Sequence, residues 1–321
     1  MTGLLPLVLL MGGTAHGAPH GGLQQSIDVH IRSDSQPVVE TTYGLLQTDS
    51  DGIWSWVCEE VSGTESAWHY ALSSEDRWIL SGVDRVMWSD DQCSWTDVEG
   101  VLQGLYITAM VADPVAPEWI WAVTASGSEE NALFLSTDHA ESFAQSATFG
   151  EASRLRDLAI HPDGTTWVVG WRDDLPWVWS SPDREAWTET QLPEDGYSIT
   201  ILGLNPEDST QAWLKLITAD GDRLIRAGTD GSTTTLMESA ESLEALAVLP
   251  QSEHILLGGR EAGLYRSTDG GESWSGPHLA PEPGCMRVHD DMLYICGSNW
   301  TDQSALSRTP LSTADPDTWE W

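Results

Sequence analysis

The chain has 321 residues, and its 50 Asp and Glu against 14 Lys and Arg give a formal net charge of −36. A field of this sign repels phosphate backbones and anionic membrane surfaces, which argues against nucleic-acid and peripheral-membrane roles. The length allows one large repeat domain or two ordinary domains. We expect no transmembrane segment, because no stretch is long and apolar enough to span a bilayer.

The first residues are typical of a secretory signal. Residues 4–11 form an apolar stretch too short to cross a membrane, and Ala15 and Gly17 are small residues before a possible cleavage point. Residues 1–3 carry no basic side chain, although such signals usually begin with one. We predict a signal peptide at residues 1–17, or up to about residue 22. The protein would then be exported, and would be secreted, periplasmic or bound at the cell surface.

The clearest motif is residues 264–274, Leu-Tyr-Arg-Ser-Thr-Asp-Gly-Gly-Glu-Ser-Trp. It predicts a strand followed by a hairpin turn, in which the Asp269 carboxylate accepts backbone N–H groups and Gly270 and Gly271 supply positive φ. Fainter copies recur along the chain, most with an aromatic residue after the turn. Across all copies, the residues to which we assign this structural role are Asp49, Trp54, Asp91, Trp95, Ser136, Asp138, Phe143, Ser181, Asp183, Trp187, Asp230, Ser267, Asp269, Gly271, Trp274, Asp315 and Trp319.

The copies repeat at about 44 residues, the period expected of four-stranded propeller blades. Each unit consists of short apolar strands separated by turns that contain Pro, Asp or Gly, and no segment has convincing helical periodicity. We therefore predict an all-β fold, a seven-bladed β-propeller of four-stranded antiparallel blades over residues 24–321. Six or eight blades are the alternatives.

Two further expectations follow from the repeat. Tryptophans recur in the second strand of successive units, and we expect them to pack between adjacent blades. The chain leaves room for only a stub of the last outer strand after Trp319. Either the residues before Ser26 complete that blade, or its outer strand is missing.

Four cysteines in an exported chain suggest two disulfides. If Asp290 and Asp291 form a two-residue turn, Cys285 faces Cys296 across a hairpin, at a separation that a disulfide can span. This pairing leaves Cys58 with Cys93. A metal site is the weaker interpretation, because neither pair has Cys-x-x-Cys spacing.

At these turns the sequence resembles the BNR, or Asp-box, β-propellers. These include sialidases, sortilin-type receptor domains, photosystem II assembly-factor propellers and exported bacterial propellers of unknown role. Residues 43–60 and 296–300 look most like the last group. The resemblance covers about residues 26–319. It implies a propeller fold and says little about activity.

Resemblance to sialidases would imply an arginine triad, a tyrosine nucleophile with a glutamate partner, and an aspartate acid/base. Arg154, Arg156 and Arg287 are the candidate arginines, and Tyr106 or Tyr197 the candidate nucleophile. None sits in a matching motif, and the family's Phe/Tyr-Arg-Ile-Pro segment is missing. We therefore predict no catalytic residue and no enzyme activity, with a sialidase-like glycoside hydrolase acting in the tunnel as the alternative.

Metal binding is also a minor alternative. Residues 49–52 resemble the start of a calcium loop with Glu60 at its twelfth position, but Ile53 stands at the fifth and residues 54–57 are typical of a strand. We predict no metal and no cofactor. The leading hypothesis is a monomeric binding or scaffold module that recognises an unidentified protein or glycan through loops at the tunnel mouth.

Overall fold

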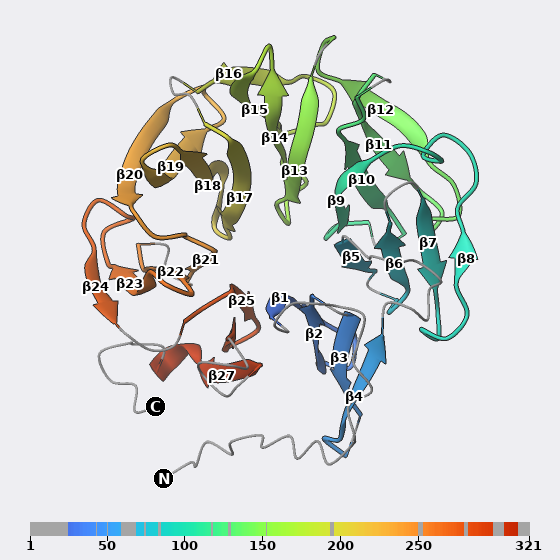
Figure 1. Ribbon diagram of the computed structural model, residues 1–321, viewed down its shortest axis with the longest axis horizontal. Helices are drawn as coiled ribbons and strands as arrows, with labels where there is room; N and C mark the ends of the chain where they lie inside the picture. The colour runs from blue at the N-terminus through green and yellow to red at the C-terminus, as the bar shows by residue number, and fades with distance from the viewer. Residues whose placement is uncertain are drawn as a thin grey trace.

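The protein is a ring of seven antiparallel sheets around a central axis, so the predicted seven-bladed β-propeller is confirmed (Figure 1). The computed structural model describes residues 25–42, 44–49, 51–58, 69–73, 75–82, 85–116, 118–127, 130–151, 153–192, 196–249, 253–278, 282–297 and 305–313. Within these residues six blades have four strands and the seventh has three. The predictions made for residues 1–17, Asp315 and Trp319 lie outside the described residues.

The blades follow one another in chain order. Blades 1 and 2 consist of β1 (Ser26–Ile31), β2 (Pro37–Thr41), β3 (Gly44–Thr48), β4 (Trp54–Cys58), β5 (His69–Leu72), β6 (Trp78–Ser81), β7 (Val86–Ser89) and β8 (Thr96–Asp97). Blades 3 and 4 consist of β9 (Ile107–Ala112), β10 (Ile120–Thr124), β11 (Ala132–Ser136), β12 (Ala144–Thr148), β13 (Arg154–Ile160), β14 (Thr166–Arg172), β15 (Leu175–Ser181) and β16 (Thr188–Gln191).

Blades 5 to 7 complete the ring. Blades 5 and 6 consist of β17 (Ser198–Asn205), β18 (Asp208–Thr218), β19 (Gly221–Gly228), β20 (Thr233–Ser239), β21 (Ala245–Val248), β22 (Ile255–Gly259), β23 (Gly263–Ser267) and β24 (Ser275–His278). Blade 7 consists of β25 (Cys285–His289), β26 (Met292–Cys296) and β27 (Leu306–Pro310), followed by the short 3-10 helix η2 (Leu311–Thr313).

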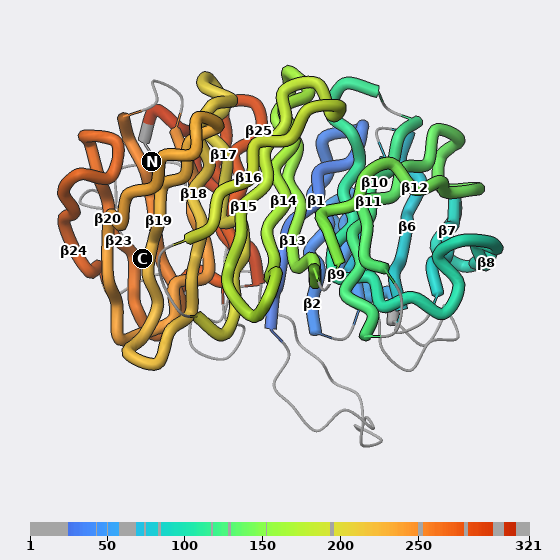
Figure 2. The backbone as a smooth tube through the Cα atoms, turned by 90° about the horizontal axis from the view of Figure 1, so that it is seen from above, coloured from blue at the N-terminus to red at the C-terminus, as the bar shows by residue number. Residues whose placement is uncertain are grey.

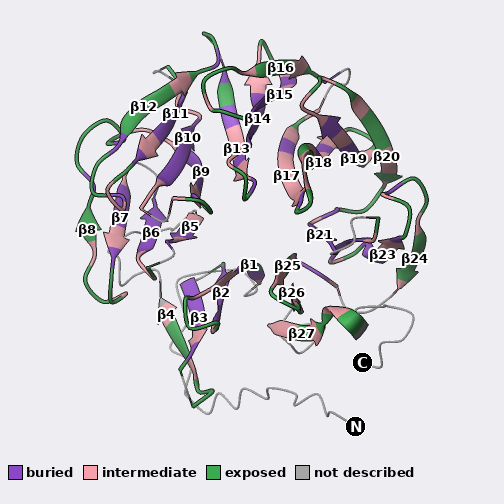
Figure 3. Cartoon of the chain, turned by 180° about the vertical axis from the view of Figure 1, so that it is seen from behind, coloured by how far each residue is buried: buried purple, intermediate pink, exposed green. Residues whose placement is uncertain are grey.

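The first strand of each blade is the innermost and the last lies at the periphery (Figure 1). Burial is greatest in the second strands: β2, β6, β10 and β22 are buried throughout, whereas the outer strand β8 is exposed and β12 and β16 are mostly exposed (Figure 3). Neighbouring blades cover both faces of each sheet, which explains why the second strands are rich in apolar residues.

Tryptophans on the second strands fill the spaces between blades, as expected. Trp121, Trp167 and Trp213 are completely or almost completely buried and belong to cores shared with the following blade. Trp78 also starts a second strand, but it packs against blade 1, the preceding blade, beside Val38. A shift of one residue along a strand moves a side chain to the opposite face, which accounts for the different partner.

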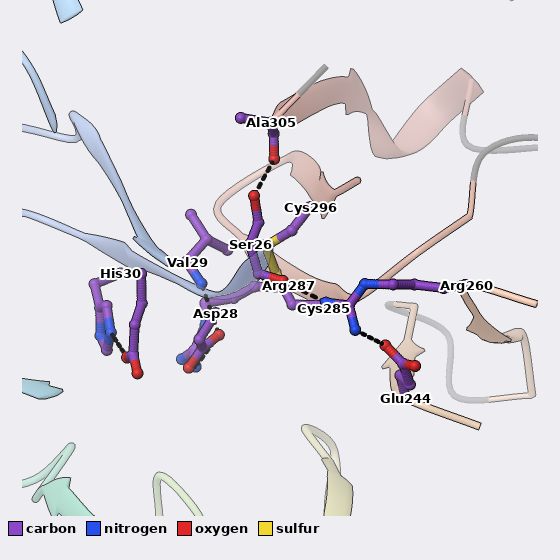
Figure 4. Close-up of a disulfide and its surroundings, with 11 residues drawn as sticks. Ser26, Asp28, Val29, His30, Glu244, Arg260, Cys285, Arg287, Cys296 and Ala305 are labelled. Atoms are coloured by element: carbon purple, nitrogen blue, oxygen red, sulfur yellow. Dashed lines mark hydrogen bonds and ion pairs between the residues drawn. A yellow bond between two sulfur atoms is a disulfide. The ribbon is translucent and has the colours of Figure 1, made fainter. Parts of the chain in front are cut away.

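Blades 7 and 1 meet at a seam that joins distant parts of the chain (Figure 4). The hydroxyl of Ser26 donates to the carbonyl of Ala305 at 3.1 Å. Arg287 of β25 binds Asp28 of β1, with Nη2 and Oδ2 3.0 Å apart. Side-chain contacts therefore contribute to ring closure here.

Arg260 adds a third contact at the seam, although it belongs to blade 6. Its Nη2 donates to the carbonyl of Ser26 at 2.6 Å, and its Nη1 binds Glu244 (Figure 4). The guanidinium crosses directly over Gly284, where a Cβ would lie 2.4 Å from Nη2. A side chain at this position would displace the guanidinium from its contact with Ser26.

The predicted hairpin of blade 7 is present with the predicted register. Cys285 pairs with Cys296 across the strands, their Cα atoms are 4.9 Å apart and their sulfurs are bonded. Both cysteines are buried against Val29 and Val39 of blade 1. The disulfide therefore lies in the core of the seam.

The second predicted disulfide, Cys58 with Cys93, is not formed, because Cys93 is an exposed free thiol. Cys58 pairs with Gly44 at the end of β4 remote from its preceding turn. Cys93 lies in the corresponding turn of the next blade, between β7 and β8. Five strand residues span roughly 16 Å, so the two positions lie at opposite faces of the ring. The prediction of a Cys58–Cys93 disulfide was wrong because these cysteines lie on different faces.

The Cys285–Cys296 bond should stabilise the ring. With a separation of 11 residues, loop closure predicts that the Cys285→Ala/Cys296→Ala variant loses about 3 kcal/mol of unfolding free energy. Denaturant unfolding under non-reducing conditions measures this loss. The control Cys93→Ala should change stability by less than about 0.5 kcal/mol, and equal effects of the two variants would contradict the prediction.

Candidate functional site

The loops of the propeller gather on two opposite faces, which the edge-on view in Figure 2 separates. Every complete blade has four antiparallel strands, so all the innermost strands run in the same direction. We call the face with the turns between third and fourth strands the box face. The opposite linker face carries the connections between blades, and each innermost strand starts there.

The predicted turns of the box face are built from internal hydrogen bonds. Asp269 accepts the backbone N–H of Ser273 at 2.9 Å and its hydroxyl at 2.5 Å, while Ser267 Oγ accepts the N–H of Gly271. Gly270 and Gly271 both have positive φ, as expected. The motif that suggests a sialidase name therefore has a structural role.

The turn of blade 3 repeats this geometry without glycine. Asp138 accepts from the N–H and hydroxyl of Ser142, and Ser136 Oγ accepts the N–H of Ala140. Ala140 has a φ of 68° where Gly271 has 91°. This conformation costs an L-residue on the order of 1 kcal/mol, so the hydrogen bonds hold Ala140 in a strained position.

The fainter copies also hold their turns with hydrogen bonds to the aspartate. Asp91, Asp183, Asp49 and Asp230 each accept backbone N–H groups within their own turn. Sequence reasoning missed the serine before the aromatic residue, which donates to the turn aspartate in three blades. Its signal was the repeated Ser-aromatic pair, and its members are Ser94, Ser142 and Ser273.

These hydrogen bonds keep the turn aspartates ionised. Bonds from the side chain and backbone of Ser273 lower the pKa of Asp269 to about 2. Backbone bonds from Ser94 and Cys93 likewise lower the pKa of Asp91 to about 2. A carboxylate this acidic makes a poor general base at neutral pH.

Arginines fasten the box-face turns to neighbouring blades. Arg77 of blade 2 donates to the carbonyl of His139, and Arg226 of blade 5 donates to the equivalent carbonyl of Gly270. Arg184, in the turn of blade 4, lies 2.6 Å from Asp113 of blade 3, whose side chain is fully buried. These arginines occupy structural positions.

Removing Arg184 should strongly destabilise the protein. Arg184→Leu leaves the buried Asp113 carboxylate without its positive partner, and we expect a loss of about 3 kcal/mol in the free energy of unfolding. In the control Arg226→Leu, the partner Glu272 is well exposed, so the loss should stay below about 1 kcal/mol. Denaturant titration of both variants tests this order, and the reverse order would contradict it.

The innermost strands carry two aspartates at equivalent positions. Asp28 on β1 and Asp157 on β13 each follow a residue that interrupts the register with the second strand. In both, one carboxylate oxygen accepts the next residue's N–H, from Val29 at 2.7 Å and Leu158 at 2.8 Å. A β-bulge re-aims side chains in this way and is frequent near functional sites.

The environments of these two aspartates shift their pKa values in opposite directions. Removal from water raises the pKa of Asp157 to about 6, although the N–H groups of Ile201 and Leu158 oppose the rise. Burial also raises the pKa of Asp28, but Arg287 and His30 outweigh it and the value falls below the usual range.

Two histidines lie on the innermost strands of blades 1 and 2. His30 contacts the buried Glu40 with Nε2 and Oε2 3.1 Å apart (Figure 4). Burial raises the pKa of Glu40, against the effect of His30. Burial and the charge of Arg156 lower the pKa of His69 to about 4.

On the linker face, apolar and aromatic side chains lie exposed where the innermost strands begin, and we call this central region the mouth. Tyr106 and Tyr197 occupy equivalent positions, one residue before β9 and β17, and Arg154 begins β13 between them. Tyr197 is 74% exposed, and Ile27 near the start of β1 is 45% exposed. We call Ile27, Tyr106, Arg154 and Tyr197 the mouth residues.

Each of the arginines considered for a sialidase-like site lies beside an acidic side chain of this chain. Arg287 is bound to Asp28, and Arg156 lies close enough to Asp157 and His69 to influence both. Arg154 stands at the exposed mouth, 3.9 Å from Asp174. Each arginine thus has a different carboxylate of this chain as its neighbour. Tyr106 and Tyr197 lie at the mouth beside Arg154.

Asp49 of the possible calcium loop accepts the N–H groups of Asp51 and Ile53, and Glu60 lies outside the described residues. Across the described part of the chain, no group of three or more His, Cys, Asp or Glu is placed to hold a metal ion. The same residues contain no helix long and apolar enough to cross a membrane.

Solved β-propellers are similar to this chain. YCF48 from Cyanidioschyzon merolae aligns with a TM-score of 0.65 and 14% identity, over 90% of this chain and 96% of that one. Virginiamycin B lyase from Staphylococcus aureus has a TM-score of 0.63 and 11% identity, over 88% and 94%. A xyloglucanase from Xanthomonas campestris has 0.63 and 15%, over 91% of this chain and 55% of its own length.

These structures define the class of the protein as a β-propeller. At such identities the likeness extends to the fold alone, and the similar structures include both enzymes and a YCF48 with a bound D1 peptide. No family model and no curated protein matches the sequence. The Asp-box resemblance therefore rests on the turn motifs themselves.

The pKa shift of Asp157 predicts a specific pH dependence. Its folded-state pKa of about 6 lies above the ordinary 3.8, so the folded state holds the proton more tightly. Stability from this group is present below about pH 4 and is lost as pH rises to about 6. Relative to wild type, Asp157→Asn should therefore become more stable across this window, by up to about 3 kcal/mol.

Denaturant unfolding at several pH values between 4 and 7 measures this difference. The control Asp28→Asn should show no comparable slope, because the pKa of Asp28 is lowered and its titration lies below the window. Parallel pH profiles for wild type and Asp157→Asn would contradict the assignment.

Proposed function

We propose that this protein is an exported, non-catalytic binding module that holds a segment of a partner protein at the mouth of the linker face. The observation that carries the proposal is the presentation of Tyr197. Its backbone N–H donates to the carbonyl of Ile217 at 2.7 Å, while its side chain is 74% exposed. An exposed tyrosine on a fixed backbone offers contact area at little entropic cost, as in many binding hot spots.

The other mouth residues favour a polypeptide as the partner. Tyr106 has its backbone fixed in the same way, because its N–H donates to Ser126 Oγ at 2.9 Å. Arg154 is largely exposed and its nearest carboxylate, Asp174, is itself 93% exposed, so its donors can reach the carbonyls of a bound chain. A YCF48 structure with a bound peptide shows that this fold accommodates such ligands.

Peptide selection tests the proposal. A library of random 12-residue peptides displayed on phage is selected against the wild-type chain, and enriched peptides are synthesised and titrated. We expect Tyr197→Ser to weaken binding at least about tenfold, because a central aromatic anchor contributes more than about 1 kcal/mol. The control Val115→Ser removes another well-exposed apolar side chain, but from the box face, and should leave binding unchanged.

Failure to enrich any peptide whose binding depends on Tyr197 would overturn the proposal. A glycan array probed with the same three proteins covers the other partner class considered from the sequence. Glycan binding lost in Tyr197→Ser would move the site from polypeptide to carbohydrate recognition.

The hydrolase alternative has a direct assay as well. A fluorogenic sialoside should not be turned over, because the nearest carboxylates of Arg154, Arg156 and Arg287 belong to the chain itself. Turnover that disappears in Arg156→Leu or Arg287→Leu would replace the binding module with an enzyme.

A further inference from the structure

The linker face combines the apolar mouth with carboxylates that have no cationic partner. Loops and linkers of blades 3 to 6 carry exposed acidic side chains around Tyr106, Arg154 and Tyr197. Five of them form no ion pair within the described part of the chain. We call this set the acidic rim, and its members are Glu130, Glu151, Asp173, Asp220 and Glu241.

On the box face, several acidic side chains accept hydrogen bonds or form ion pairs within the protein. There Asp91, Asp138, Asp183 and Asp269 accept hydrogen bonds within their turns. Glu272 is paired with Arg226. Part of the negative charge on that face is thus used in folding, whereas none of the five rim carboxylates forms an ion pair within the described residues.

We propose that the segment bound at the mouth is cationic, with an aliphatic or aromatic residue flanked by lysine or arginine. This inference rests on the proposed function and names its partner class. The apolar residue would contact Tyr197, and the flanking cations would lie over the acidic rim. The overall charge of −36 attracts such a segment from a distance and repels an acidic one.

Arg154 does not change the preference of the mouth for a cationic segment. It is a single exposed guanidinium beside Asp174, and five rim carboxylates surround the same part of the face. Its donors suit the backbone carbonyls of an extended peptide. An acidic peptide would gain one cation there and face the whole rim, so charge complementarity favours the basic segment.

The peptides selected at the mouth provide the test. We expect them to carry a net positive charge, and their dissociation constant to rise at least about tenfold between 50 and 500 mM NaCl. The rim variant Glu130→Gln/Glu151→Gln/Asp173→Asn/Asp220→Asn/Glu241→Gln should weaken binding about tenfold. A synthetic copy of the same peptide with each Lys replaced by Gln should bind wild type and rim variant equally.

A matched control changes the same charge on the other face. Asp51→Asn/Asp114→Asn/Glu185→Gln/Glu253→Gln/Asp291→Asn also neutralises five exposed carboxylates, all in box-face loops. It should leave binding within about twofold of wild type, because screening shortens the reach of these charges to about 10 Å. Thermal unfolding of both variants verifies that they are folded.

The outcomes separate the two proposals. Peptides that depend on Tyr197 but are neutral or acidic, or that bind the rim variant as well as wild type, would overturn the cationic partner and leave the binding site in place. Equal weakening by the rim and box-face variants would also overturn it, since the effect would then come from net charge alone. If no selected peptide depends on Tyr197 for binding, both the binding site and the cationic partner would be overturned.

Discussion

Every blade of this ring depends on burying both of its faces against its neighbours. The second strands β2, β6, β10 and β22 are buried throughout, and the large buried side chains of Trp121, Trp167 and Trp213 belong to cores shared by two blades. At about 25 cal/mol per Å² of apolar surface, that burial dominates the stability of the fold. A blade on its own would expose these surfaces to water, so the blades stabilise one another only as a ring.

The box-face turns reinforce this packing with polar contacts. The turn aspartates hold their own loops, and Arg77, Arg184 and Arg226 connect those loops to adjacent blades. Aspartates and arginines are common in active sites, but here they hold the turns in place. The exposed aromatic and acidic side chains of the linker face lie on connections between blades and on turns between second and third strands, and the five rim carboxylates form no ion pair within the described residues. We therefore expect the functional site on the linker face, where these side chains are exposed.

The fold and the hairpin disulfide could be predicted because their signals are local. The turn at Asp269 and the pairing of Cys285 with Cys296 involve residues at most 11 positions apart. The seam could not be predicted in this way, since Arg260 reaches Ser26 across 234 residues and Arg287 reaches Asp28 across 259. No pattern in the sequence aligns such partners. Tyr197 was named from the sequence as a possible nucleophile, but its exposure at the mouth required the ring.

The seam also has a consequence for the order in which the chain folds. Blade 1 is synthesised first, yet its Val29, Val39 and Leu46 gain their partners Tyr294 and Cys296 only when blade 7 emerges. Contacts of this sequence separation slow folding and leave apolar surface open to aggregation in the meantime. The face of blade 1 that meets blade 7 is thus the last to be buried, so the core of the seam forms only at the end of folding.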